Sequence, residues 1–389
     1  MAARAVVRDV GRVMDLSLAE VDQIAKKIPA ELKMTLDKAL KVEPDLQKMV
    51  YGLMSDPTRA SNAGAALLME PTSGEVRAIV SIPTFDPALI DTIFESLDPE
   101  IQPLVNRATQ GQYAPGSVFK ILTAAAALDT PTYGTDGGLI TPDYMFYFND
   151  DLQPPPGPAG YNTWWHEGAC AVTASYQGFG NFDFAQALAY SDNVVFAQIG
   201  QALGPFRFRE YAEAFGIGRT YEIGIEVAPS SLARDPAYLE TSCGLAQTAF
   251  GQGQLFVTPL QIAMIGATVA NDGELAYPRL VTRPRVGERG WRVISKEAAN
   301  QVTDMMVAVT EDEYGSGINA QIEGVHVAGK TGTAQVNGAP HAWFVGFAPA
   351  ENPQYLAVVI LEHQGEGSQW AAPLVRDILA NALSTVEQP

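Results

Sequence analysis

The stretch GVHVAGKTGTAQVNGAPHAWFVGFAPAENPQYLAVVILEH, residues 324–363, contains three strand patterns in succession. GVHVAGKTGTAQV, HAWFVGFAP and YLAVVILEH are separated by glycine, proline and asparagine residues, which favour turns. Far upstream, residues 63–83, AGAALLMEPTSGEVRAIVSIP, have the pattern of two strands joined by a turn from Pro71 to Gly74. We expect this hairpin and the last three strands to meet in one sheet.

The segment between these two groups of strands has a different periodicity. From residue 117 to about 310 the apolar spacing is mainly helical, with a proline-rich interruption, DDLQPPPGPAGYN, at residues 150–162. A closing helix is predicted over AAPLVRDILANAL, residues 371–383. Early strands, a helical middle and late strands predict an α+β fold: an antiparallel sheet with helices on its faces and an inserted helical subdomain.

The first 60 residues predict two short helices. Ser17 and Glu20 have the spacing of a capping box, and apolar residues then recur at helical intervals as far as Pro29. The second helix, PDLQKMVYGLM, begins at Pro44 and places its apolar residues on one face. A chain of 389 residues exceeds the usual size of one core, so we expect a helical appendage over residues 1–60 and a large domain over 61–389.

Charge and composition exclude some classes of function. The 25 Lys and Arg residues against 44 Asp and Glu residues give a net charge of −19, which argues against nucleic acid as a partner. The four histidines lack metal-ligand spacing, and neither a metal nor another cofactor is predicted. Cys170 and Cys243 lack C-x-x-C spacing, which favours two inert thiols over one disulfide.

No window of the sequence predicts a membrane span. The best candidate, LFVTPLQIAMIGATVA at residues 255–270, is interrupted by Pro259 and Gln261. The first residues also lack the apolar centre of a signal peptide. Taken alone, this favours a cytoplasmic protein, although a chain from which an anchor was removed fits equally well.

QYAPGSVFKILTAAAAL, residues 112–128, places Ser117 before an apolar helix with Lys120 in its first turn. At this spacing the lysine amine can reach the serine oxygen. A lysine whose pKa is lowered by apolar surroundings can accept a proton. Alone, the stretch favours a simpler interpretation, in which Ser117 caps the helix and Lys120 extends its charge to water.

YSDNVVFAQIG, residues 190–200, interrupts a helical pattern with Ser191, Asp192 and Asn193. Ser191 or Asp192 could cap the following helix. In the functional interpretation, Ser191 relays a proton and the Asn193 amide holds a peptide substrate.

VAGKTGTAQV, residues 327–336, has the pattern of a strand with glycines where side chains are expected. Gly332 indicates close approach of a backbone or ligand. Lys330, Thr331 and Thr333 could bind a substrate carboxylate, and the Thr333 N–H could bind an oxyanion. An exposed strand end would explain the pattern equally well.

The order S-x-x-K, S-D-N, K-T-G resembles the penicillin-binding proteins and serine β-lactamases. Residues 61–389 are similar to the transpeptidase domain of class B penicillin-binding proteins, the monofunctional peptidoglycan cross-linkers. The similarity extends to PLVNRATQGQYAPGSVFK, GQGQLFVTPLQIA, ANDG and HAWFVGFAP. It implies a five-stranded sheet, an inserted helical subdomain and an active site between them.

The resemblance also implies roles for individual residues. Ser117 would attack the penultimate D-alanine carbonyl of a stem peptide ending in D-Ala-D-Ala, or a β-lactam, and Lys120 would accept its proton. Ser191 and Lys330 would carry the proton to the leaving amine. The substrate-binding group is implied to be Asn193, Thr331, Gly332 and Thr333, with the N–H groups of Ser117 and Thr333 as an oxyanion hole.

The same resemblance implies a cellular setting. The protein would act on the extracytoplasmic face of the bacterial membrane, beside a glycosyltransferase and other cell-wall machinery. The first 60 residues depart from the class B pattern, which has a membrane anchor and a larger pedestal domain. An anchorless form or an atypical short member is implied.

Four related activities remain alternatives. They are a serine β-lactamase, a D,D-carboxypeptidase, a penicillin sensor and a non-catalytic wall-binding protein. One class of serine β-lactamase is known by an E-x-x-x-N motif after S-D-N. Here Glu226 is followed four positions later by Ser230 instead of asparagine, which favours the transpeptidase. Outside the motifs, Trp164, Trp165 and His166 are placed in a loop, where packing is favoured over lining the cleft, and His341 is interpreted as structural.

Overall fold

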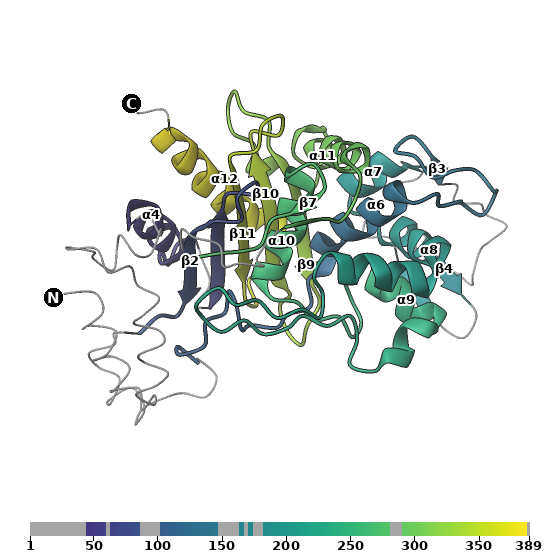
Figure 1. Ribbon diagram of the computed structural model, residues 1–389, viewed down its shortest axis with the longest axis horizontal. Helices are drawn as coiled ribbons and strands as arrows, with labels where there is room; N and C mark the ends of the chain where they lie inside the picture. Colours follow the sequence, from purple (N-terminus) through teal and green to yellow (C-terminus); the bar gives the residue numbers. More distant parts are fainter. Residues whose placement is uncertain are drawn as a thin grey trace.

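The computed structural model describes residues 44–59, 63–85, 102–146, 163–166, 170–173, 182–280 and 290–386. At its centre is an antiparallel five-stranded sheet with the strand order β2-β1-β11-β10-β9 (Figure 1). The strands are β1 (Gly64–Met69), β2 (Val76–Ile82), β9 (Ala328–Ala334), β10 (His341–Ala348) and β11 (Tyr355–Leu361). The five-stranded antiparallel sheet predicted from the sequence is confirmed.

The early hairpin joins the late strands through β1 and β11. These two strands pair in register, with Ala66 opposite Val359 and Leu67 opposite Val358. Every residue of β1 and of β11 is buried, as expected for strands at the centre of a sheet covered on both faces. Strand β9 lies at one edge of the sheet, where its outer side is free to meet other elements.

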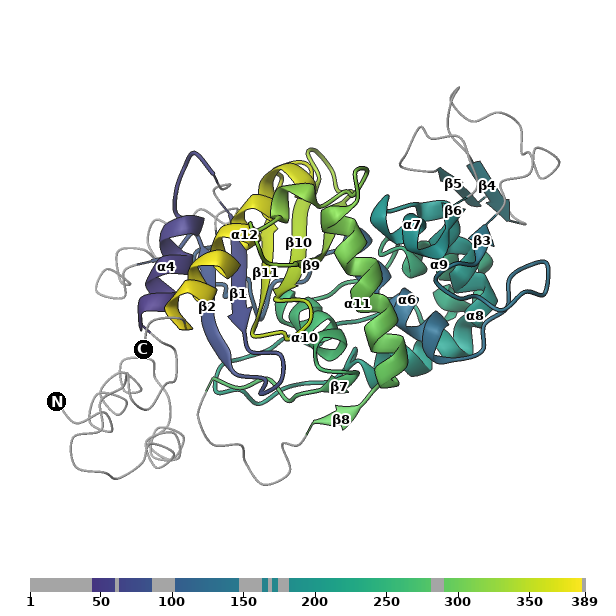
Figure 2. The same cartoon turned by 90° about the horizontal axis from the view of Figure 1, so that it is seen from above.

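Two hydrophobic cores form on the two faces of the sheet, because alternate residues of each strand point to opposite sides. One core includes Val359 of β11, α4 (Pro44–Met54) and α12 (Gly367–Val386), which lie side by side in Figure 2. The other core includes Val358, α10 (Pro259–Ala270) and α11 (Lys296–Glu311). All twelve residues of α10 are buried. The most apolar window of the sequence is therefore the central helix of the larger core.

The inserted helical subdomain lies beyond the β9 edge (Figure 1). It contains α6 (Lys120–Asp129), α7 (Phe184–Ala189), α8 (Asn193–Ala214) and α9 (Ser242–Ala249). Helix α8 is kinked where Gly204 leaves the helical region and Pro205 follows it. Short turns of 3₁₀-helix are η2 (Gly116–Phe119), η4 (Pro236–Glu240) and η5 (Ile318–Ala320).

The structure also describes three small two-stranded sheets, of which two accompany this mainly helical region and one lies beside α10. Their strands are β3 (Met145–Phe146) with β6 (Phe182–Asp183), β4 (Thr163–His166) with β5 (Cys170–Thr173), and β7 (Glu274–Leu275) with β8 (Trp291–Arg292). The loop predicted for Trp164, Trp165 and His166 is therefore wrong, because these residues pair with Cys170–Val172. The proline-rich stretch at residues 150–162 lies outside the described residues.

The N-terminal region is described only from residue 44, so the helix predicted over residues 17–28 lies outside it. The second predicted helix is α4, and its apolar face of Leu46, Val50 and Met54 packs into the core shared with α12. The division of the chain at residue 60 stays a prediction.

The expectation of inert thiols is wrong for Cys243. This residue lies in α9 and is disulfide-bonded. The sequence contains one other cysteine, Cys170, in β5. A fixed bond at Cys243 therefore anchors α9 within the inserted subdomain.

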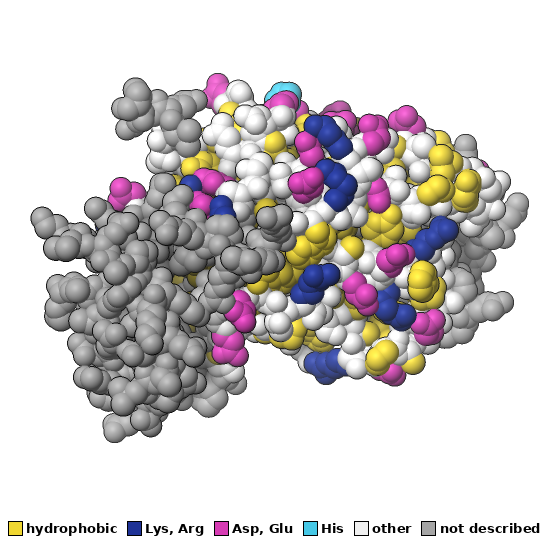
Figure 3. Space-filling view, in the orientation of Figure 1, with side chains coloured by type: hydrophobic (Ala, Val, Ile, Leu, Met, Phe, Trp, Pro, Cys, Tyr) yellow, Lys and Arg dark blue, Asp and Glu magenta, His cyan; other side chains and the backbone are white. Residues whose placement is uncertain are grey.

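Within the described ranges, no helix combines the length and the apolar character that crossing a bilayer requires. On the face of the molecule shown in Figure 3, the described Lys and Arg side chains are interspersed with Asp and Glu. The charges of this face are therefore mixed.

Candidate active site

Ser117 lies in a tight elbow that begins at Gly116. It belongs to the single 3₁₀ turn η2, and α6 begins at Lys120. Gly116 has a φ of 58°, and a Cβ atom there would come within 2.7 Å of the Thr333 carbonyl oxygen. Its N–H donates to the Gly251 carbonyl at 2.9 Å. The elbow is thus held between β9 and the Gly251 loop, and Ser117 caps no helix, contrary to the simpler interpretation.

Lys120 is completely buried, so its amine does not extend to water. Its Nζ lies 3.0 Å from Ser117 Oγ and 3.3 Å from Ser191 Oγ. Shorter contacts reach the Ser191 carbonyl at 2.6 Å and Asn193 Oδ1 at 2.7 Å. Burial lowers the pKa of Lys120 to about 7, against a smaller opposite effect of the Asp192 charge. This lysine can therefore exchange a proton with a neighbouring hydroxyl near neutral pH.

The S-D-N segment forms the junction between α7 and α8. Ser191 has a φ of 64°, uncommon for a residue with a side chain, and its carbonyl and hydroxyl both contact Lys120. Asp192 is the N-cap of α8 and accepts a hydrogen bond from the Val195 N–H at 2.9 Å. Capping by Asp192 is confirmed, and it coexists with the contacts of Ser191 and Asn193 to Lys120.

Lys330 is the second fully buried lysine of the site. Its Nζ donates to Ser191 Oγ at 2.9 Å and lies 3.3 Å from Thr331 Oγ1. Burial, and then the charge of Lys120, hold the pKa of Lys330 well below its ordinary value. An exposed strand end is excluded for this residue. Ser117, Lys120, Ser191 and Lys330 thus form a continuous chain of hydrogen-bonded groups.

The outer edge of β9 faces the elbow. The Thr333 carbonyl accepts from Gln252 Nε2 at 3.4 Å, so it points away from β10. In a strand, the N–H and C=O of one residue point to the same side, so the Thr333 N–H also points outward. A Cβ atom on Gly332 would lie 3.0 Å from the Pro115 carbonyl. The close approach that this glycine indicated in the sequence is the backbone of the Ser117 elbow.

The structure brings the sequence-predicted site residues together, in the groups just described. Sequence reasoning missed two of their neighbours. Ser316 shares a hydrogen bond of 2.9 Å with Thr331 Oγ1, and its N–H donates to the Ala189 carbonyl. Gln252 covers the Thr333 carbonyl. Gln252 belongs to the GQGQ stretch, which is part of the resemblance to the transpeptidase domain and could have indicated its place in the site. Nothing in the local sequence indicates the same for Ser316.

Other candidate groups lie apart from this chain. His341 is buried and accepts a hydrogen bond from the His363 N–H through Nδ1. Burial, and then His363, lower its pKa. Among the residues that the structure describes, no group of three His, Cys, Asp or Glu could hold a metal ion.

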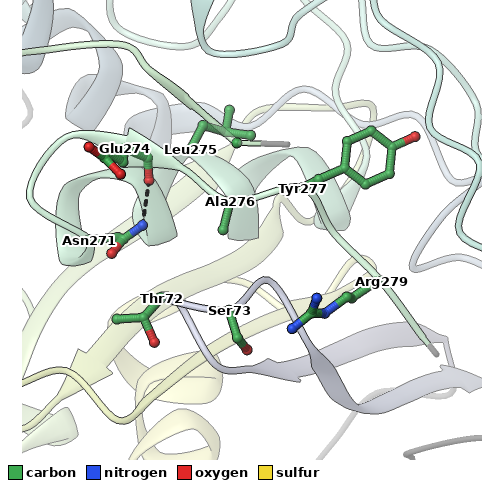
Figure 4. A pocket seen from close by; sticks show the side chains of 9 residues that line it. Thr72, Ser73, Asn271, Glu274, Leu275, Ala276, Tyr277 and Arg279 are labelled. Atoms are coloured by element: carbon green, nitrogen blue, oxygen red, sulfur yellow. Dashed lines mark hydrogen bonds between the residues drawn. The ribbon is translucent and has the colours of Figure 1, made fainter. Parts of the chain in front are cut away.

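A cavity of about 330 Å³ lies at the turn of the first hairpin. Figure 4 shows Thr72 and Ser73 on one side of this cavity and Asn271 on the other, and the Asn271 amide donates to the Glu274 carbonyl. None of its lining residues belongs to the three motifs, so this cavity is separate from the candidate active site.

The chain belongs to the family of penicillin-binding protein transpeptidase domains. The family model described as "Penicillin binding protein transpeptidase domain" matches residues 64–380. A second model, described as a bacterial DNA polymerase III alpha NTPase domain, matches residues 1–64, of which residues 1–43 lie outside the described part.

Known proteins with similar sequences are cell-wall enzymes. The peptidoglycan D,D-transpeptidase PbpA of Mycolicibacterium smegmatis is 31% identical over 378 residues, covering 88% of this chain and 71% of that protein. PbpA of Mycobacterium tuberculosis is 30% identical over 376 residues, with the same coverage.

Solved structures that resemble this chain come from the same class of protein as these relatives. The D,D-transpeptidase domain of an Eggerthella lenta peptidoglycan glycosyltransferase has a TM-score of 0.76 and 26% identity, covering 94% of this chain and 92% of that one. Penicillin-binding protein A of M. tuberculosis, in a ceftriaxone acyl-enzyme complex, has a TM-score of 0.70 and 27% identity, covering 88% and 79%. The predicted class B penicillin-binding protein family is confirmed.

Proposed function

We propose that this protein is a peptidoglycan D,D-transpeptidase that works through an acyl-enzyme on Ser117, and that β-lactams acylate the same serine. The observation that carries the proposal is the chain of contacts from Ser117 through Lys120 and Ser191 to Lys330, with both lysines fully buried. Relatives named peptidoglycan D,D-transpeptidases support the reaction class.

The proton acceptor of the first step is the neutral amine of Lys120, which carries two hydrogens and one lone pair. The two shortest contacts of Nζ are to the Ser191 carbonyl and to Asn193 Oδ1, which act only as acceptors. These two oxygens take the two hydrogens. The lone pair is then left for the Ser117 hydroxyl at 3.0 Å. This geometry favours Lys120 as the general base.

Acylation transfers one proton and exchanges one bond. Ser117 Oγ bonds to the carbonyl carbon of the penultimate D-alanine, and its proton moves to Lys120 Nζ. The carbon–nitrogen bond to the terminal D-alanine then breaks. The leaving nitrogen takes a proton through Ser191 and Lys330, which contact each other at 2.9 Å. The acceptor amine of a second stem peptide reverses these steps and forms the cross-link.

The substrate is held by groups around the elbow. Gly116 packs directly against the Thr333 peptide group, which brings the Ser117 elbow next to the outer edge of β9. The N–H groups of Ser117 and Thr333 therefore lie near each other and stabilise the oxyanion. Lys330, Thr331 and Thr333 bind the terminal carboxylate, and Gly332 leaves space for the elbow. Asn193 orients the substrate amide while its Oδ1 holds Lys120.

The substrate places the reaction outside the cytoplasm. Peptidoglycan stem peptides lie on the extracytoplasmic side of the bacterial membrane, so the enzyme acts there, with a glycosyltransferase supplying the glycan strands. The Eggerthella lenta structure, whose description combines a transpeptidase domain with a glycosyltransferase, supports this partnership.

A labelled penicillin tests the proposal directly. We expect one covalent equivalent per chain by intact-mass spectrometry, located on Ser117 by peptide mapping and absent from Ser117→Ala. Ser73→Ala is the matched control, because Ser73 lies in the hairpin turn away from the lysines and should label normally. A wild-type protein that takes up no label would overturn the proposal.

The lifetime of the adduct separates the related activities. A transpeptidase adduct with penicillin persists for hours, whereas a β-lactamase adduct hydrolyses within seconds. A D,D-carboxypeptidase would release D-alanine from a pentapeptide without requiring an acceptor amine. A penicillin sensor or a non-catalytic wall-binding protein would neither hydrolyse the penicillin adduct rapidly nor release D-alanine from the pentapeptide.

A further inference from the structure

Asp192 carries a charge that the capping of α8 does not require. Its side chain is 0% exposed, and Oδ1 accepts the capping bond from the Val195 N–H. Helices α9, α10 and α11 are capped in the same way by the neutral hydroxyls of Thr241, Thr258 and Ser295. A buried carboxylate is expensive unless an opposite charge lies close to it.

The second oxygen of Asp192 has no hydrogen-bond partner within the described part of the chain. Oδ2 is buried, unlike a capping oxygen that completes its hydrogen bonds with water. Burial raises the pKa of Asp192, and the Val195 hydrogen bond and then the charge of Lys120 act in the opposite direction. The cation nearest to this carboxylate in the described site is Lys120, whose Nζ contacts the residues on either side of Asp192, through the Ser191 carbonyl at 2.6 Å and Asn193 Oδ1 at 2.7 Å.

We propose that Asp192 is a positioning residue that supplies the counter-charge for the proton that Lys120 removes from Ser117. The inference rests on the proposed acyl-enzyme function. When the Ser117 O–H bond breaks and the Lys120 N–H bond forms, an ammonium appears on a fully buried side chain. The Asp192 carboxylate stabilises that ammonium, and Lys120 remains the proton acceptor.

Two titratable groups face Lys120 from the described elements around it, and they have opposite effects on its pKa. Lys330, on β9, repels a proton on Lys120, as the lowered pKa of Lys330 itself indicates. Asp192, at the start of α8, attracts that proton. Removing the Asp192 charge therefore lowers the pKa of Lys120 further, so that Lys120 stays neutral at lower pH but is a weaker base.

The test is the pH profile of acylation by a fluorescent penicillin, measured in the full chain. In the wild type, the second-order rate constant should rise through the Lys120 pKa of about 7. In Asp192→Asn the amide oxygen can still cap α8, and we expect the rising limb to move about one pH unit lower. Its plateau should fall about threefold because the base is weaker. The two profiles should cross.

Asp183→Asn is the matched control. Asp183 caps α7 through the same bond, to the Gln186 N–H, and lies outside the lysine chain. This variant should lose a little thermal stability and keep the wild-type pH profile. Asp192→Ser provides a second neutral cap at the decisive position, in case the asparagine variant does not fold.

The inference would be overturned if the rising limb of the pH profile stayed in place in a folded Asp192 variant, or if it moved equally far in Asp183→Asn. A limb that moves to higher pH would overturn it as well. Failure of the proposed function is distinguishable, since the wild type would then take up no penicillin at any pH.

Discussion

Strands β9 and β11 are equal in length and almost equally buried, but they differ in chemistry. β11, YLAVVIL, lies inside the sheet with an apolar neighbour on each side. β9, AGKTGTA, lies at the edge and buries a lysine and a threonine among its residues. The polar groups of β9 are matched by hydroxyls from outside the sheet, Ser191 and Ser316. Burial at the centre of the sheet stabilises the fold, whereas burial at its edge lowers a pKa.

The largest expected effect follows from removing the buried charge of β9. Lys330→Met keeps the approximate length of the side chain but cannot relay a proton. We expect acylation by penicillin to slow by about 10²- to 10⁴-fold. The free energy of unfolding should stay the same or rise, because a buried ammonium is costly. Stopped-flow acylation and urea unfolding measure the two quantities, and unimpaired acylation would remove Lys330 from the mechanism.

A truncation at the centre of the sheet should have the opposite effect. Val358 is fully buried between Leu67 and Val345. Val358→Ala should lower the free energy of unfolding by about 2 kcal/mol through lost apolar contact and a small cavity. The acylation rate per folded molecule should not change. Val359→Ala, on the face toward α12, is the matched control for the other core. A rate that falls with stability would contradict the division of labour between the strands.

The smallest effect is expected at Ser316. Ser316→Ala removes the hydroxyl that shares a hydrogen bond with Thr331, beside Lys330. We expect a loss of about 1 kcal/mol in stability. Acylation should slow a few-fold, since Thr331 becomes free to turn. Ser73→Ala, which removes a hydroxyl bonded to Glu70, should cost similar stability without changing the rate.

The sequence was sufficient to predict the sheet, because the strands of the two groups are separated by clear turn residues. It also identified Ser117, Lys120, Ser191, Asn193 and Lys330 as neighbours, but only through a resemblance between three distant motifs. Burial of the two lysines could not be derived locally, since each is enclosed by residues more than 70 positions away. The place of Ser316 depends in the same way on how distant segments fold against β9, and the bond of Cys243 depends on how the insertion folds on itself.

The Gln252 amide donates to the Thr333 carbonyl, which lies on the outer edge of β9 beside the elbow. A ligand that lies along this edge therefore exchanges one amide for another instead of filling an empty position. An extended peptide can make this exchange at little net cost, because its own N–H replaces the side chain. A ligand that displaces Gln252 without offering a donor leaves the Thr333 oxygen unsatisfied, at about 1–3 kcal/mol. The resting enzyme thus selects for amide-bearing ligands before any bond is broken.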